Sequence, residues 1–128
     1  MHNLNEALSA LALGPRPARS DLNRLLESPQ PEGVLPELVR SLPSQVWVRA
    51  RQCAKAIHAL GIQSIAPWDL PQSLKLLKNP PLCLFVRGAA ATLYGDAEAI
   101  VGSRTACDGP LWWAGQRAML ACARGRAV

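Results

Sequence analysis

Three consecutive residues, Gly102-Ser103-Arg104, have the types and spacing of a phosphate-binding turn. They follow a short apolar run at 99–101 and precede Asp108-Gly109-Pro110, which is typical of a helix start. Glycine lets a ligand approach the backbone closely, turn amides and a helix N-terminus favour an anion, and arginine donates charge-assisted hydrogen bonds. The turn is therefore a candidate site for the phosphate of a nucleotide or of DNA. The alternative is a structural corner, because neither the dinucleotide-binding nor the P-loop glycine pattern is present.

A second candidate for DNA contact is the turn at Gly14-Pro15, which interrupts an apolar helical pattern. Two short helices joined by such a turn can present backbone amides to a DNA phosphate, as in helix-hairpin-helix modules. Arg16 and Arg19 lie beside the turn, so Gly14, Arg16 and Arg19 are the candidate contacts. The alternative is a helical corner that fills a small core, because acidic residues surround the turn.

The four tryptophans supply aromatic faces on which single-stranded bases can stack. They are Trp47, Trp68, Trp112 and Trp113. Adjacent helical residues point about 100° apart, so only one of the pair Trp112 and Trp113 can face inward fully. We expect Trp47 and one of that pair in the core, with base stacking as the alternative.

No group of residues suggests catalysis, a bound metal or a cofactor. The cysteines are widely spaced, form no C-x-x-C pair and have no histidine at ligand spacing. They are Cys53, Cys83, Cys107 and Cys122. We expect reduced, partly buried thiols in a protein that is not an enzyme, because no carboxylate pair or activated nucleophile is evident.

The charge distribution favours an anionic partner. Residues 1–37 carry three Arg against five Asp and Glu, a net charge of −2, and residues 38–128 carry eleven Lys and Arg against four, a net charge of +7. Clustered basic side chains bind phosphates by releasing counterions. The alternative is a coding bias towards arginine and proline.

The chain has the composition of a soluble globular protein, with 49% apolar and 18% charged residues among 128. No apolar run approaches the roughly 18 residues of a membrane helix. The N-terminus carries Glu6 and lacks the basic segment of a secretory signal. We therefore expect a cytoplasmic protein with no membrane partner.

Hydrophobic periodicity predicts the elements that position these residues. Leu4, Leu8 and Leu11 form one apolar stripe, and the helix ends at Gly14, which can adopt the left-handed conformation. Helices are predicted over residues 3–13, 18–27, 44–61 and 110–123, with a short proline-interrupted element after the second. Strands are predicted over 82–87 and 98–102, antiparallel if they pair, because their connection is too short for a crossover helix.

The order of these parts resembles the DNA-processing protein family known as DprA or Smf. The resemblance covers nearly the whole chain, and its most specific part is "AIVGSR" at residues 99–104, with Gly109 at the head of the next helix. Further matching pieces are Gly14-Pro15-Arg16, Trp68-Asp69-Leu70-Pro71, and Asn79-Pro80-Pro81 before the apolar run 82–88. The chain departs from the family at 105–109, where the family commonly has a Ser, a Tyr and a Gly and this sequence includes Asp108.

The resemblance implies a fold that is an α+β or α/β fragment. A helical bundle of the SAM-like, helix-hairpin-helix type would occupy residues 1–66. A proline-rich linker would follow over 67–80, and the first strands and helix of an incomplete Rossmann-like domain would occupy 81–128.

The resemblance also implies a function. Family members bind single-stranded DNA and help to load the recombinase RecA during natural transformation, without enzymatic activity. Gly102 and Ser103 would supply amide donors to a DNA phosphate, and Arg104 the charged contact. The implied partners are single-stranded DNA, a RecA-type recombinase and a second copy of the chain.

The family pattern continues into further strand-helix units after the point that Val128 matches. The resemblance therefore implies either a truncated member with impaired activity, which we favour, or a short paralogue kept for its N-terminal module. The alternative function is a protein-interaction module, in which the apolar helix 110–123 docks onto a full-length homologue or a recombinase.

Overall fold

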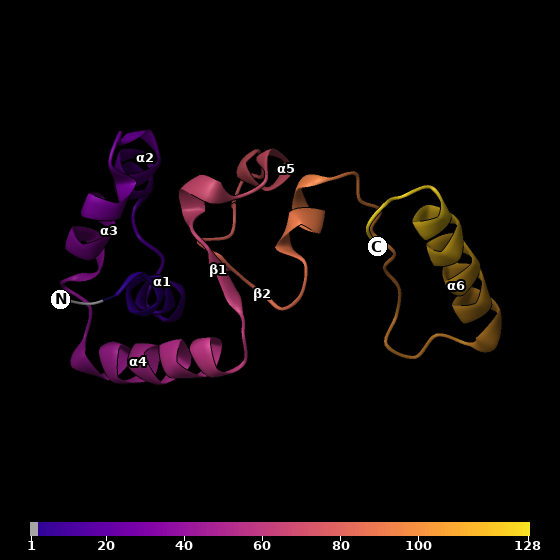
Figure 1. The fold of residues 1–128 in the computed structure, drawn as a ribbon, viewed down its shortest axis with the longest axis horizontal. Helices are drawn as coiled ribbons and strands as arrows, with labels where there is room; N and C mark the ends of the chain where they lie inside the picture. Colours follow the sequence, from indigo (N-terminus) through magenta and orange to yellow (C-terminus); the bar gives the residue numbers. More distant parts are fainter. Residues whose placement is uncertain (1–2) are drawn as a thin grey trace. The chain divides into compact units, whose positions relative to one another are not determined.

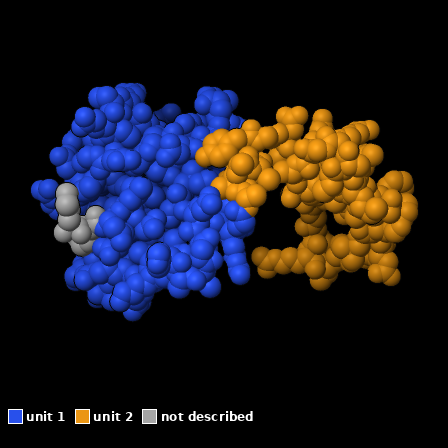
Figure 2. Space-filling model, viewed as in Figure 1, with its two compact units in different colours: residues 1–88 blue, residues 89–128 orange. Residues whose placement is uncertain are grey.

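The computed structural model describes residues 3–128, which divide into two compact units (Figure 2). Unit 1 extends to Gly88, and unit 2 comprises residues 89–128. Helices are combined with a small antiparallel sheet, so the α+β character that the sequence predicts is confirmed. The domain limits expected at residues 66 and 80 stay predictions.

A set of helices forms the first part of unit 1 (Figure 1). These are α1 (Leu4–Leu13), α2 (Arg19–Glu27), α3 (Pro31–Val39) and α4 (Ser44–Ala59). The helices predicted over 3–13, 18–27 and 44–61 are confirmed, and the proline-interrupted element is α3, which contains Pro36. Asn3 caps α1, because its side-chain oxygen accepts a hydrogen bond from the Glu6 amide at 2.8 Å. Gly61 ends α4 with a φ of 62°.

Gly14 ends α1 for a different reason from the one expected. Its φ of −79° and ψ of 175° are extended values, so the prediction of a left-handed conformation is wrong. A Cβ atom on this residue would lie 3.0 Å from the carbonyl oxygen of Ala10 and 3.0 Å from Cδ2 of Leu42. Glycine is favoured here, because a Cβ atom would force the Leu42 side chain or the Ala10 carbonyl to shift.

The core of unit 1 lies where α1 packs against α3 and α4. Leu8, Leu25 and Leu35 are fully buried, and Trp47 joins the same cluster, which confirms its predicted place in the core. Ser9 is buried beside Leu8, and its hydroxyl has no hydrogen-bond partner among the described residues. The leucine stripe of α1 therefore supplies the centre of this unit.

The sheet of unit 1 pairs β1 (Gln63–Ile65) with β2 (Leu84–Val86) in antiparallel register, Ser64 opposite Phe85. β2 lies within the predicted strand 82–87, whereas β1 is not among the predicted strands and falls within residues 1–66, which the resemblance implies to be helical. Between the strands lie a 3₁₀ turn, η1 (Pro67–Asp69), and a short helix, α5 (Gln72–Lys75). The segment between the strands is thus part of unit 1.

Unit 2 contains a 3₁₀ helix, η2 (Ala90–Tyr94), and the long helix α6 (Asp108–Ala123) (Figure 1). The strand predicted over 98–102 is wrong, because the chain there is irregular and Val101 is 92% exposed. A single parallel bridge joins Ala97 to Ala127, with the Glu98 amide donating to the Ala127 carbonyl at 2.8 Å. Segments on either side of α6 therefore begin to pair in parallel.

α6 exposes most of its apolar side chains. Trp112 and Trp113 are 58% and 69% exposed, so the prediction that one of them lies in the core is wrong. Their rings contact each other edge to face, with centroids 5.0 Å apart. Ala121 is the one apolar side chain of the described unit 2 that is fully covered.

The cysteines are all reduced, but their burial differs from expectation. Cys83 is half-buried, and burial raises the pKa of its thiol to about 11. The other three are exposed.

Among residues 3–128, no cluster of His, Cys, Asp and Glu side chains could hold a metal ion. No helix within that range has the length and apolarity needed to cross a membrane.

Candidate nucleic-acid interface

Residues 102–104 lie in an exposed segment four to six residues before the start of α6. Gly102, Ser103 and Arg104 are all exposed, and none of them forms a hydrogen bond within the described part of the chain. A Cβ atom on Gly102 would meet nothing within 4 Å. The backbone amides and the guanidinium group are therefore accessible to an anion from solvent.

The N-terminus of α6 follows this segment. Cys107 is its N-cap and forms no side-chain capping bond, so the helix begins at Asp108, two residues before the predicted start at residue 110. The first-turn amides carry partial positive charge, which favours a nearby phosphate. Asp108 lies in the same turn and is exposed, so its carboxylate competes with an incoming anion for this positive potential.

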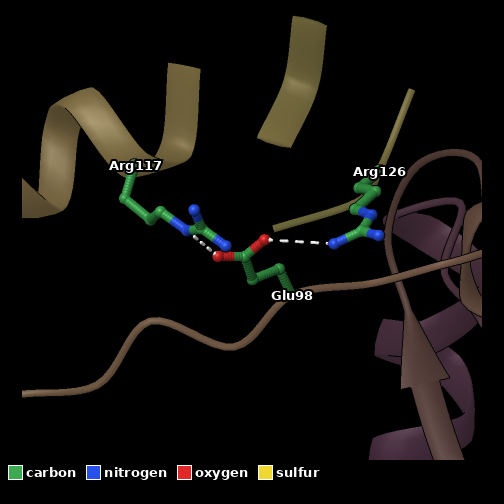
Figure 3. A network of polar contacts seen from close by, with 3 residues as sticks. All are labelled: Glu98, Arg117 and Arg126. Atoms are coloured by element: carbon green, nitrogen blue, oxygen red, sulfur yellow. Dashed lines mark hydrogen bonds and ion pairs between the residues drawn. The ribbon is translucent and has the colours of Figure 1, made fainter. Parts of the chain in front are cut away.

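Glu98 anchors the strand-like segment that leads into the turn (Figure 3). Its carboxylate accepts a hydrogen bond from Nε of Arg117 on α6 and forms an ion pair of 3.6 Å with Nη1 of Arg126. The hydrogen bond from Arg117 lowers the pKa of the Glu98 carboxyl group, and the charges of both arginines act in the same direction. One carboxylate thereby links three segments of unit 2, whereas the Arg104 side chain forms no ion pair with any described residue.

The second candidate site for DNA contact lies in unit 1, and its residues Gly14, Arg16 and Arg19 have different structural roles. Gly14 is explained by its close packing on Leu42. Arg16 is exposed, and its Nη2 atom donates to the Pro80 carbonyl at 2.8 Å, so this side chain holds the segment before β2. Arg19 is the first residue of α2, is exposed, and its side chain forms no hydrogen bond or ion pair with any described residue. A DNA contact by these residues stays a prediction.

Two lysines that the sequence analysis missed lie near this second candidate. Lys75 and Lys78 line, together with Arg16 and Arg19, a cavity of about 350 Å³ in unit 1. Their three-residue spacing in "SLKLLKN" is a local basic pattern, but nothing local relates it to arginines almost sixty residues earlier. The fold therefore brings four basic side chains, distant in the sequence, to the same cavity.

Comparison with known proteins identifies the family. A family model described as DNA recombination-mediator protein A matches residues 62–128, which are 67 of the 128 residues. The match includes both strands of unit 1 and the whole of unit 2, with the exposed segment 102–104. No curated protein and no solved structure matches the chain. The chain belongs to the DNA recombination-mediator protein A family.

Proposed function

We propose that this chain binds single-stranded DNA through residues 102–104 and helps to load a RecA-type recombinase during natural transformation. The observation that carries the proposal is the exposed, unbonded backbone and side chain of Gly102-Ser103-Arg104, which lie four to six residues before the start of a sixteen-residue helix. The family match supports a role in DNA recombination. The action is binding, and no catalytic residue is assigned.

In this proposal a DNA phosphate lies beside the turn. The amides of Gly102 and Ser103 donate to its oxygens, and the Arg104 guanidinium adds a charge-assisted contact. The positive end of α6 adds to the attraction, and Asp108 reduces it. Such contacts recognise the backbone and carry no base specificity, as expected of a protein that binds single strands of any sequence.

We further propose that unit 2 is the start of a Rossmann-like domain and that the helices of unit 1 form a SAM-like bundle. The parallel bridge between Ala97 and Ala127, with α6 between them, supports the first assignment, because parallel neighbours require such a crossover. The short helices α1 and α2, joined at Gly14, support the second.

Fluorescence anisotropy with labelled oligo-dT tests the DNA-binding function. Binding should weaken as salt rises, and Arg104→Gln should lower the affinity by about tenfold to a hundredfold, since a hydrogen bond to a charged group contributes roughly 1.5–3 kcal/mol and about 1.4 kcal/mol is a factor of ten. Because one phosphate contact is lost, the slope of log affinity against log salt should fall by about 0.7. Arg124→Gln is the control, since Arg124 is exposed and follows α6 at its opposite end. No binding at low salt, or equal affinities for the two variants, would contradict the assignment.

A second candidate function, protein docking, is favoured by the exposed apolar side chains of α6. Leu111, Trp112, Trp113 and Met119 are each more than half exposed, a composition typical of protein interfaces. The partner in this case is a recombinase, as the recombination role of the family suggests, or a homologue of the chain.

Light scattering after size exclusion distinguishes the two candidates. Docking predicts self-association or a complex with RecA that Trp113→Ser abolishes without changing the affinity for oligo-dT. A strictly monomeric chain that neither binds RecA nor enhances the fluorescence of an apolar dye would exclude docking through α6.

A further inference from the structure

A cavity of about 350 Å³ lies in unit 1 between α2 and the segment that connects β1 to β2. This volume is at the lower end of the roughly 300–1,000 Å³ typical of small-molecule sites. Its basic lining residues are Arg16, Arg19, Lys75 and Lys78. No carboxylate lines the cavity, so the positive charge at its surface has no compensating group within the lining.

The basic side chains divide into two fixed and two available groups. Arg16 donates to the Pro80 carbonyl, and Nζ of Lys75 donates to the Trp68 carbonyl at 2.5 Å, so each is held by an uncharged acceptor that leaves its charge in place. The side chains of Arg19 and Lys78 are exposed and form no hydrogen bond or ion pair within residues 3–128. Arg19 and Lys78 can therefore turn towards an anion while Arg16 and Lys75 maintain the positive potential.

The remaining wall is apolar and includes an aromatic ring. Trp68 is half-buried and lines the cavity together with Leu22 and Leu26 of α2. Asn23 and Asn79 add amide groups that can hydrogen-bond a base edge. A ligand that carries a phosphate at one end and a flat heterocycle at the other satisfies both kinds of lining, because bases stack on aromatic and apolar side chains while Arg and Lys bind the phosphate.

We propose that this cavity binds one nucleotide of single-stranded DNA, with the phosphate at Arg19 and Lys78 and the base against Trp68. The inference rests on the proposed function, since it supplies a second contact for the same DNA on unit 1. An acidic peptide could satisfy the four positive charges but would leave the aromatic wall without a matching group. The nucleotide is therefore the occupant that uses the whole lining.

NMR titration of the ¹⁵N-labelled full chain with thymidine 5′-monophosphate tests the inference directly. Amide shifts should concentrate in residues 16–26 and 67–82, saturate, and be reproduced by a short oligo-dT that competes for the same site. The double substitution Arg19→Gln/Lys78→Gln should weaken binding of the nucleotide at least tenfold. Arg49→Gln/Lys55→Gln, which removes two exposed positive charges from α4 away from the cavity, should leave it unchanged.

A substitution at the aromatic wall separates the base contact from the phosphate contact. Trp68→Leu should reduce the affinity for the nucleotide several-fold and leave that for inorganic phosphate the same, and the spectrum of each variant reports whether it is folded. Shifts that spread over the chain, a cavity that responds to tetraglutamate and not to the nucleotide, or a nucleotide that oligo-dT does not displace would each overturn the proposal.

The inference and the proposed function fail separately. Arg104→Gln should leave the nucleotide-induced shifts of unit 1 intact, since residue 104 belongs to unit 2. If oligo-dT binds through unit 2 while the amides around the cavity do not shift, the inference is wrong and the proposed function stands. If the cavity binds the nucleotide and oligo-dT affinity is indifferent to Arg104→Gln, the assignment of residues 102–104 is wrong instead.

Discussion

Leu8→Ala is expected to lower the free energy of unfolding of unit 1 by about 3 kcal/mol. Leu8 has no exposed surface and lies in the cluster that includes Leu11, Leu25 and Leu35, where α1 packs on its neighbours. The substitution removes apolar contacts and leaves a cavity that the surrounding helices fill only in part, and both effects reduce stability. Urea unfolding followed by circular dichroism, with tryptophan fluorescence, to which the buried Trp47 contributes, as a second probe, measures the change.

Ser9→Ala, at the neighbouring position, is a matched control for which no loss of stability is expected. Ser9 is 1% exposed, and its hydroxyl has no hydrogen-bond partner among the described residues. Ser9→Ala removes an unsatisfied buried polar group and improves helix propensity, so it should leave unit 1 equally stable or stabilise it by about 1 kcal/mol. Equal losses of stability in the two variants would contradict the packing described for α1.

The helices of unit 1 could be predicted because their signals are local. The leucine stripe of α1 and the glycine that ends α4 act through neighbours within a turn or two. The reason for Gly14 was not local: its missing Cβ accommodates Leu42, which lies twenty-eight residues away. Sequence spacing therefore predicts where α1 ends but not the packing that favours glycine at this position.

The strands could not be predicted in the same way, because pairing depends on distant residues. β1 has three residues, followed by the proline-containing η1, and is a strand because Ser64 lies opposite Phe85. Residues 99–101 have the apolar character of a strand, but among the described residues the only bridge nearby is the one between Ala97 and Ala127. A short apolar run without a neighbour to complete its hydrogen bonds stays irregular.

The two candidate sites also differ in whether their residues are neighbours in the sequence or are brought together by the fold. Gly102-Ser103-Arg104 are consecutive, so their types could be recognised from the sequence alone, and the structure adds that they are exposed and unbonded. Lys75 and Lys78 join Arg19 only through the packing of α2 beside η1. No spacing rule relates positions so far apart, so the cavity could be found only after the fold was known.

Acid is expected to loosen unit 2 selectively, through Glu98. This unit buries one apolar side chain fully among its described residues, and the contacts of Glu98 with Arg117 and Arg126 link α6 to the segments on either side of it (Figure 3). The pKa of Glu98 is lowered from its ordinary value of 4.5 in the folded chain, chiefly by the hydrogen bond from Arg117. A lowered folded-state pKa gives stability that is present above 4.5 and is lost as the pH falls through the folded-state value.

Hydrogen exchange of two amides reports on this loss. The Glu98 amide donates to Ala127 at 2.8 Å, and the Ala127 amide donates to Asp96 at 2.9 Å, so both exchange only when the bridge opens. Their protection factors should fall between pH 6 and pH 3, whereas that of Ile62, bonded to Ile57 in unit 1, should change little. In Glu98→Gln the two bridge amides should show low protection at both pH values. The neutral side-chain amide of glutamine attracts the two arginines more weakly than the carboxylate does.

Glu37→Gln is the matched control, because it breaks the exposed ion pair between Glu37 and Arg24 in unit 1. Exposed pairs of this kind contribute little to stability, so the bridge amides of unit 2 should keep their response to pH in this variant. Protection at residue 98 that is unchanged by acid, or that survives Glu98→Gln, would show that contacts other than this carboxylate hold the segment before the turn. Because that segment leads directly to Gly102, the same Glu98→Gln chain should also bind oligo-dT more weakly than the parent chain at pH 7, since the turn is then held less firmly in front of α6.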